Sequence, residues 1–259
     1  MRDAGLDRAI DAAGGVAQLA RKIGIAQPSV SNWNRVPAER VVAVAAATGV
    51  SRTVLRPDLY CEPLVPDDAV DPVDAGRALE YALLANLLSS APSTVLLEQI
   101  AQLRDDATPL GRAHANLAEA ASQAVAAEVE REYFDLFIGV GRGELLAYAS
   151  YYLTGFLNER PLSRLRDDLA ALGIERAEIN FEPEDHAATL CEIMAGLASG
   201  RFPAAPEVQR AFFEKHVSCW MGQLFADMEK AESAKFYRLV GTLGRLFLGI
   251  ETEGFTFAN

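Results

Sequence analysis

Residues 182–186 read Glu-Pro-Glu-Asp-His and place three carboxylates and one of the chain's three histidines around a proline. Side chains of these types support four kinds of chemistry. A carboxylate beside a histidine can transfer protons, and carboxylates and a histidine on one helix face can bind a metal ion. Carboxylates also bind guanidinium groups, and they stabilise the first turn of a helix. Other features of the sequence distinguish between these four interpretations.

Two of the four interpretations find little support elsewhere in the sequence. Proton transfer by Asp185 and His186 needs a nucleophile or a substrate site, but the chain has no G-x-S-x-G motif and only His114 and His216 as further histidines. Glu182, Asp185 and His186 lie at i, i+3 and i+4 and could share a helix face. No second carboxylate–histidine pair of that spacing follows. We therefore predict that the protein is not an enzyme and has no metal site.

The helix-start interpretation accounts for the acids. If Pro183 is the first helical residue, Glu184 and Asp185 occupy the first turn, where the positive helix end favours carboxylates. This interpretation gives His186 no role. A structural helix start and a peptide-binding corner therefore both remain open at this point.

The composition is that of a globular protein. The 259 residues are 50% hydrophobic, enough for one large core or two smaller ones. The N-terminal stretch lacks an apolar run before a cleavage site, so we expect a soluble, cytoplasmic protein without stable membrane insertion. The three cysteines, at positions 61, 191 and 219, are odd in number and lack C-x-x-C spacing, which argues against disulfides and a zinc site.

Charge is spread unevenly along the chain. Residues 1–60 hold eight Lys/Arg and five Asp/Glu, a net charge of +3, although the whole chain carries −12. The remaining residues therefore carry −15. A basic head and a strongly acidic body suggest two modules with different partners, whereas an acidic surface that only aids solubility is the plainer alternative.

The sequence divides into three parts. Residues 61–76 carry three prolines and four aspartates without helical periodicity, as is typical of a linker. We expect a DNA-binding head over residues 1–60, this linker, and a helical body over residues 77–259.

The body is predicted to be an all-α bundle. Apolar residues recur there at spacings of three and four, without the alternation of strands, which predicts roughly seven to nine helices. Three apolar stripes are expected in its core: Leu117, Val125, Val129, Tyr133 and Leu136; Phe213, Val217, Trp220, Leu224 and Met228; and Phe236, Val240, Leu243, Phe247 and Ile250.

The head carries the pattern of a helix-turn-helix. Ala20 is the small residue where two helices cross, and Gly24 follows where the turn needs positive φ. Apolar anchors flank both, and a second helix is predicted to begin near Gln27. Side chains expected to contact base edges or phosphates are Gln27, Ser29, Ser31, Asn32 and Arg35, together with Arg21 and Lys22.

The head also resembles YdaS-type, Cro-like helix-turn-helix domains over residues 5–60. The resemblance is carried by GG-x-x-x-LA from Gly14, S-x-W from Ser31, PAER and LRPD. It implies a repressor-like domain that binds duplex DNA by sequence, usually as a dimer on a two-fold site.

Motifs in the body resemble the TorD/DmsD/NarJ family of all-helical chaperones for molybdenum enzymes. In order they are Y-x-x-L-F-x-G from Tyr133, S-x-Y-L from Ser150, E-P-x-D-H from Glu182 and F-x-x-H-x-x-x-W from Phe213. The resemblance covers residues 77–252. It implies binding of a molybdopterin oxidoreductase apoprotein, in many members through its twin-arginine signal peptide, until the cofactor is inserted.

The resemblance further implies a peptide-binding cavity near Asp185 and His186. The matching positions are Tyr81, Tyr133, Phe137, Tyr148, Tyr152, Glu182, Pro183, Asp185 and His186. Carboxylates can hold the two arginines of the signal peptide, and an apolar groove can hold the run that follows. We expect Asp185 to be the main arginine partner.

The body departs from the family pattern in one loop. Val140 and Ala147 replace prolines, Tyr148 replaces a tryptophan, and Arg142 and Glu144 are unusual there. We expect no bound cofactor, because the chain has no P-loop motif. The leading prediction is a molybdoenzyme chaperone with a DNA-binding head. The alternative is a transcription regulator whose body senses client or cofactor supply.

Overall fold

The computed structural model describes residues 3–31, 33–37, 40–50, 52–56, 71–104, 106–175 and 182–257. The chain forms two compact units, a head up to Asp67 and a body from Asp68. Within the described residues both units are helical and contain no strand, only one isolated bridge, so the predicted all-α class is confirmed. None of the helices in these ranges is long and apolar enough to cross a membrane.

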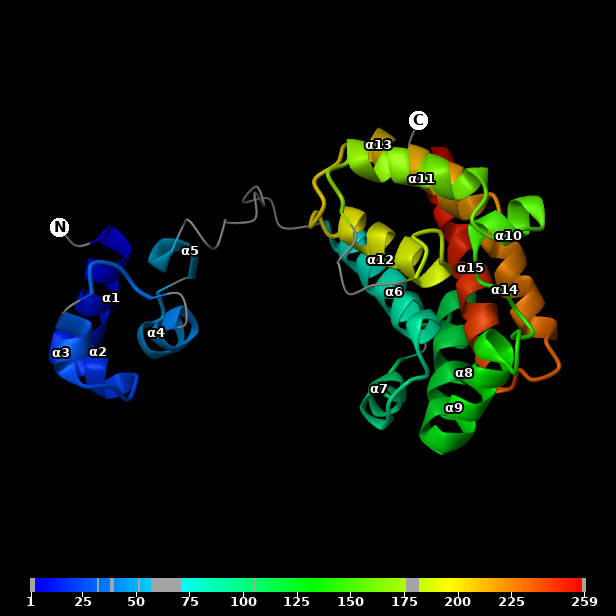
Figure 1. Cartoon of the computed structure of the whole chain (residues 1–259). Coiled ribbons are helices and arrows are strands. Elements are labelled where there is room, and N and C mark those ends of the chain that lie inside the picture. The colour runs from blue at the N-terminus through cyan, green and yellow to red at the C-terminus, as the bar shows by residue number, and fades with distance from the viewer. Residues whose placement is uncertain are drawn as a thin grey trace. The chain divides into compact units, whose positions relative to one another are not determined.

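The described part of the head contains five short α-helices (Figure 1): α1 (Ala4–Ala13), α2 (Val16–Lys22), α3 (Gln27–Ser31), α4 (Val41–Thr48) and α5 (Arg52–Leu55). They enclose a small apolar core of their own, which includes Leu6, Leu19 and Val30. The side chain of Asp3 caps α1 by accepting from the Gly5 N–H at 2.8 Å. A cap of this kind satisfies one of the donors that a helix N-terminus leaves unpaired.

Helices α2 and α3 form the predicted helix-turn-helix. Ala20 is buried at the crossing, and Gly24 in the turn has a φ of 71°, which favours glycine. The Ile25 N–H donates to the Ala20 carbonyl at 3.0 Å and closes the turn. Helix α3 begins at Gln27, where the sequence placed the start of the second helix.

The body is built from two long helices and the helices that pack on them. Helix α6 (Pro72–Ser89) packs along α12 (Ala187–Ala198), and α15 (Phe236–Phe257) packs along α14 (Met221–Lys230) (Figure 1). Helix α8 (Pro109–Gln123) covers α15 and is joined by α7 (Thr94–Ile100). The remaining α-helices of the described body are α9 (Ala126–Tyr133), α10 (Ala149–Thr154), α11 (Arg160–Ala171) and α13 (Pro206–Phe212). Two π-helical segments, Phe134–Ile138 and Phe213–Ser218, continue α9 and α13.

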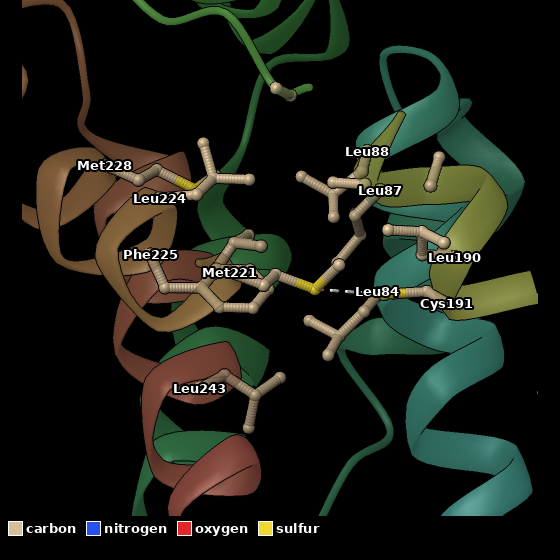
Figure 2. Close-up of a cluster of buried hydrophobic side chains, with 14 of the residues drawn as sticks. Leu84, Leu87, Leu88, Leu190, Cys191, Met221, Leu224, Phe225, Met228 and Leu243 are labelled. Atoms are coloured by element: carbon tan, nitrogen blue, oxygen red, sulfur yellow. Dashed lines mark hydrogen bonds between the residues drawn. The ribbon is translucent and has the colours of Figure 1, made fainter. Parts of the chain in front are cut away.

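Apolar side chains from four of these helices meet in the core of the body. Figure 2 shows leucines of α6 facing Met221, Phe225 and Met228 of α14, with Leu243 of α15 beside them. The buried thiol of Cys191 lies 3.8 Å from the Met221 sulfur. Because burial raises the pKa of Cys191 to about 12, its thiol stays protonated and acts as an apolar core group.

Two of the three predicted core stripes each contain one exposed residue. The stripe from Phe213 to Met228 is fully buried. In contrast, Val125 is 56% exposed, because α8 ends at Gln123 and Val125 is the extended residue before α9. Ile250 is 50% exposed, because it borders a cleft between α15 and neighbouring helices.

Two expectations about organisation differ from the structure. Residues 72–76 were predicted to be linker, but they form the first turn of α6, because the Asp71 side chain caps the Val73 N–H and Pro72 suits a first helical position. The described body has ten α-helices, α6 to α15, rather than seven to nine, because α7 and α10 are too short to show a clear period.

Candidate functional site

Residues 182–186, here called the corner, do not form the start of a helix. Helix α12 begins at Ala187, and His186 is its N-cap, with Nδ1 accepting from the Ala188 N–H at 3.2 Å. The helix-start interpretation placed the first helical residue at Pro183, four positions too early. It also gave His186 no role, whereas in the structure His186 caps α12.

The corner is bound to the segment before α10 through backbone hydrogen bonds. Tyr148 and His186 form an antiparallel bridge. The Ala149 N–H donates to the Asp185 carbonyl at 3.0 Å, and the Ala187 N–H donates to the Ala147 carbonyl at 2.8 Å. The S-x-Y-L and E-P-x-D-H motifs are therefore adjacent in space although they are more than thirty residues apart.

Asp185 is directed inward at this junction. It is 1% exposed, and its Oδ2 accepts from the Ser150 N–H at 2.8 Å and from the Ser150 hydroxyl. Ser150 itself is fully buried. The carboxylate that the sequence favoured as the arginine partner is thus paired within the protein.

Glu184 also has a partner on a neighbouring helix. Its Oε2 accepts from Nε and Nη2 of Arg166, on α11, at 3.0 and 2.8 Å. The hydrogen bond to Glu184 raises the pKa of Arg166. This pair attaches the corner to α11.

Glu182 faces a different side. It is exposed and accepts from the Tyr148 hydroxyl at 2.6 Å. It lines a cleft of about 450 Å³, here called the corner cleft, between α6, α12 and the end of α9. Tyr133 and His186 also line this cleft, so three of the predicted peptide-binding residues meet there.

Burial and the Glu182 charge set the protonation of the aromatic and imidazole groups. Burial, followed by Glu182, raises the pKa of Tyr133 to about 12 and raises the pKa of Tyr148 as well. Burial lowers the pKa of His186, against the opposing charges of Glu182 and Asp185. Near neutral pH the corner therefore presents one outward carboxylate, neutral phenols and a neutral imidazole.

The other predicted peptide-binding residues lie elsewhere. Tyr81 is fully buried and its hydroxyl donates to Glu251 at 2.9 Å, so it belongs to the core. Phe137 packs on Tyr133 with ring centres 5.0 Å apart. Tyr152 donates to Asp227 at 3.2 Å and lines a separate, shallower cleft of about 310 Å³. Pro183 lies in the corner but not among the residues of the corner cleft.

Several residues of the corner cleft were missed by the sequence reasoning. Helix α12 contributes Glu192, and Arg201 lies beyond its end. Helix α6 contributes a stripe of small and polar residues at i, i+3, i+4 and i+7: Ala82, Ala85, Asn86 and Ser89. That spacing of small and polar residues defines a helix face outside the core, and it is the signal in the sequence that marks this wall of the corner cleft.

The predicted DNA-contact residues of the head lie on its surface. All of those that the structure describes are exposed: Gln27, Ser29, Ser31, Arg35, Arg21 and Lys22. Asn32 lies outside the described residues. Arg56, one of the eight basic residues of residues 1–60, is instead buried and donates to the Val36 carbonyl at 2.8 Å.

No group of three or more His, Cys, Asp or Glu side chains is arranged to hold a metal ion in the parts of the chain that the structure describes. At the corner, Asp185 and His186 are each occupied by a structural hydrogen bond. The spacing that placed them on one helix face with Glu182 does not apply, because these residues precede the helix.

Comparison with known proteins identifies relatives of both units. Residues 103–226 match the family described as the nitrate reductase delta subunit, and residues 6–64 match the family described as bacterial toxin YdaS. The chain is 28% identical over 130 residues to chaperone protein TorD of Vibrio cholerae serotype O1, covering 47% of this chain and 59% of that protein. It is 27% identical over 137 residues to chaperone protein TorD of Aliivibrio fischeri, covering 49% and 63%.

The chain spans about three fifths of the length of these curated relatives. The two resemblances drawn from the sequence motifs are thereby confirmed: this chain is similar to TorD chaperones and to the nitrate reductase delta subunit in its body, and to YdaS in its head.

Proposed function

We propose that the body is a chaperone for the precursor of a molybdopterin oxidoreductase and that the corner cleft binds the twin-arginine segment of its signal peptide. The similarity to TorD chaperones supports the class of function. The observation that supports the site is the outward carboxylate of Glu182 beside Tyr133 and His186 in the corner cleft.

The chemistry of the corner cleft suits a cationic peptide. Glu182 and Glu192 supply two carboxylates to its wall. A third charged residue of the cleft, Arg201, lies over the Phe202 ring and donates to the backbone carbonyl of Glu192 at 3.2 Å. Carboxylates accept from guanidinium groups, whose planar forks suit them.

Asp185 takes a different part in this proposal from the one predicted. Since its carboxylate is held by Ser150, it positions the corner rather than binding the client. Glu182 replaces it as the arginine partner. Tyr148 supports this role because its hydroxyl orients the Glu182 carboxylate.

Calorimetric titration of the full chain with a synthetic twin-arginine signal peptide of a molybdopterin oxidoreductase tests the proposal. The peptide should bind, and the same peptide with two lysines should bind more weakly, because lysine lacks the planar fork. Glu182→Gln should weaken binding about tenfold, which corresponds to about 1.4 kcal/mol.

Glu159→Gln is the matched control, because Glu159 is an exposed acid outside the corner cleft. Its affinity for the peptide should equal that of the unchanged protein. Equal affinities for Glu182→Gln and the unchanged protein would remove the corner cleft from the proposal, and no binding of the arginine peptide would remove the signal-peptide function.

A second function, DNA binding by the head, is favoured by the helix-turn-helix geometry around Gly24 and the exposed polar face of α3. The full chain should retard genomic duplex fragments in a gel at low salt, with affinity falling as salt rises, because phosphate contacts release counterions. Arg21→Ala combined with Lys22→Ala should weaken retardation. No retardation at low salt would contradict the proposal.

The same two assays separate a chaperone with a DNA-binding head from a regulator. In a regulator the client peptide changes DNA affinity, and DNA must then change peptide affinity by the same factor. If saturating twin-arginine peptide leaves the DNA affinity unchanged, the two units act separately and the chaperone proposal is preferred.

A further inference from the structure

One end of the corner cleft carries a positive charge that the proposed binding of arginines does not use. Arg201 lines this cleft with Glu182 and Glu192, and its side chain is exposed. Glu182 precedes α12 and Arg201 follows it, with Glu192 on the helix between them. The wall that α12 provides therefore has a carboxylate at one end and a guanidinium at the other.

The turn after α12 is built so that Arg201 lies against the helix. Gly200 has a φ of 71°, and the chain then folds back so that the Phe202 N–H donates to the Gly196 carbonyl at 2.9 Å. A Cβ on Gly196 would come within 2.4 Å of the Phe202 ring and 3.1 Å of Arg201 Nε. Glycine at position 196 thus leaves both side chains the space that they occupy on α12.

Two contacts fix the Arg201 guanidinium and leave most of its donors available. Its Cζ lies 4.8 Å from the centre of the Phe202 ring, and Nη2 donates to the Glu192 carbonyl at 3.2 Å. Phe202 itself packs against the core of the body. A guanidinium has five N–H donors, and within the described residues no ion pair joins this one to an acid. Arg201 is thus positioned with donors left for an acceptor that enters the cleft.

A plainer role for Arg201 would be to stabilise the C-terminal end of α12, where a cation is favourable. Such a cation is expected at one of the last four carbonyls of the helix, which lack helical partners. Arg201 donates instead to the carbonyl of Glu192, although α12 continues to Ala198. Its contact therefore holds the guanidinium along the wall of the cleft rather than over the helix end.

The wall between the two charges has the length of a short extended peptide. Helix α12 lines the cleft from Ala188 to Ala195, which is about 10 Å at the rise of an α-helix. An extended peptide advances about 3.3 Å per residue, so about three residues cover this wall. A peptide arginine at Glu182 then leaves the residue about four positions away beside Arg201.

We propose that Arg201 binds an acidic side chain of the client peptide, about four residues from the arginine that Glu182 binds. The inference rests on the proposed function and adds a second recognised charge to it. A guanidinium and a carboxylate form two parallel hydrogen bonds, so this pair fixes the direction and register of the peptide in the cleft. A peptide without the acid binds at Glu182 but leaves Arg201 unpaired.

Four fluorescein-labelled peptides with the same twin-arginine segment test the proposal by fluorescence anisotropy with the full chain. The neutral peptide has glutamine at the fourth residue on either side of the arginine pair. Two peptides have glutamate at one or the other of these positions, and the last has glutamate directly beside the pair. One of the two distant glutamates should tighten binding about fivefold relative to the neutral peptide, and the adjacent glutamate should not.

The overall charge of the body works against this result, which makes a gain informative. Residues beyond position 60 carry a net charge of −15, so their combined field should weaken the binding of any peptide that gains an acid. Tighter binding of a glutamate peptide therefore reports a cation close to that glutamate. Dependence on the position of the glutamate reports where the cation lies.

Two variants assign the gain to Arg201, and a third is the matched control. Arg201→Gln should remove the gain and leave the affinity for the neutral peptide unchanged. Arg201→Glu should reverse the preference, so that lysine at the favoured position binds more tightly than glutamate. Arg238→Gln changes an exposed arginine of α15 outside the corner cleft and should keep the gain.

The proposal is overturned if neither distant glutamate tightens binding to the unchanged protein, a comparison that does not depend on how any variant folds. A gain that survives Arg201→Gln, or a preference that Arg201→Glu does not reverse, overturns it as well. These outcomes leave the proposed function standing as long as the neutral peptide binds and Glu182→Gln weakens it. Failure of the neutral peptide to bind is instead the failure of the proposed function.

Discussion

Replacing Asp185 with asparagine should destabilise the body and leave peptide binding nearly unchanged. The Asp185 carboxylate is 1% exposed and accepts two hydrogen bonds from Ser150. Hydrogen bonds to a charged group contribute about 1.5–3 kcal/mol each, against about 0.5–1.5 kcal/mol for neutral pairs. The asparagine oxygen can keep both bonds but only as neutral ones, so the free energy of unfolding should fall by about 2 kcal/mol.

Asp185→Ala removes both hydrogen bonds and leaves the buried Ser150 N–H without an acceptor. This variant should lose about 3 kcal/mol or more. Ser150→Ala removes only the hydroxyl bond and should cost less than Asp185→Ala. Combined with Asp185→Asn it should cost less than the sum of the two single changes, because the two side chains share one interaction.

Urea unfolding measures these differences. The chain has two tryptophans, Trp33 in the head and the buried Trp220 in the body. In a Trp33→Phe background the fluorescence reports the body alone. Glu182→Gln serves as the control from the same corner, because Glu182 is exposed and should contribute little to stability.

The opposite result refutes the reasoning. If Asp185→Asn leaves the unfolding free energy unchanged and weakens the twin-arginine peptide tenfold, Asp185 is the client contact that its sequence motif suggested. The assignment of the arginine to Glu182 would then be wrong.

Three further predictions concern other positions in the two units. Burial lowers the pKa of His186 below 6.5, so the neutral imidazole that caps α12 stabilises the fold fully above that pH. The free energy of unfolding, measured with urea at about pH 7.5 and 5.5, should therefore be lower at the acidic pH. His186→Asn should reduce this difference, because asparagine caps a helix without titrating. Glu132→Gln should lower the free energy of unfolding by about 2 kcal/mol in the same assay, because the Glu132 carboxylate accepts from three N–H groups at the start of α15. An unchanged urea midpoint would contradict this stabilising role. Gly24→Ala should lower the free energy of unfolding of the head by about 1–2 kcal/mol, because Gly24 has a positive φ that alanine adopts poorly. The melting temperature followed by Trp33 fluorescence should fall. An equal melting temperature would mean that the turn adjusts to the alanine.

The fold of both units could be predicted from local patterns. The spacing of Leu19, Ala20, Gly24 and Val30 defined the helix-turn-helix, and the described structure keeps it. In the body, the stripe from Phe213 to Met228 is buried throughout, although it runs from a π-helical segment (Phe213–Ser218) across Trp220 into α14. At Val125, the extended residue between α8 and α9, the same spacing predicts burial wrongly, because the chain is not helical there.

The direction of side chains at the corner could not be predicted in this way. Helical periodicity says which residues share a face only once a helix is present, and α12 begins one residue after the motif. The pairing of Asp185 with Ser150 joins positions 35 apart in sequence. Nothing in the local pattern reports such a contact, so burial of this carboxylate had to come from the structure.

Because the backbone of the corner is not helical, its neighbouring acids Glu182 and Asp185 point in different directions. In a helix that included Glu182, Glu182 and Asp185 would lie three positions apart on one face and repel each other. In the bend and turn before α12, Asp185 points into the core and accepts from Ser150, whereas Glu182 points outward to Tyr148 and the corner cleft. The inward carboxylate fixes the two segments together, and it therefore sets where the outward one stands. Under the proposed function, loss of Asp185 should therefore lower the stability of the body, whereas loss of Glu182 should lower the affinity for the peptide.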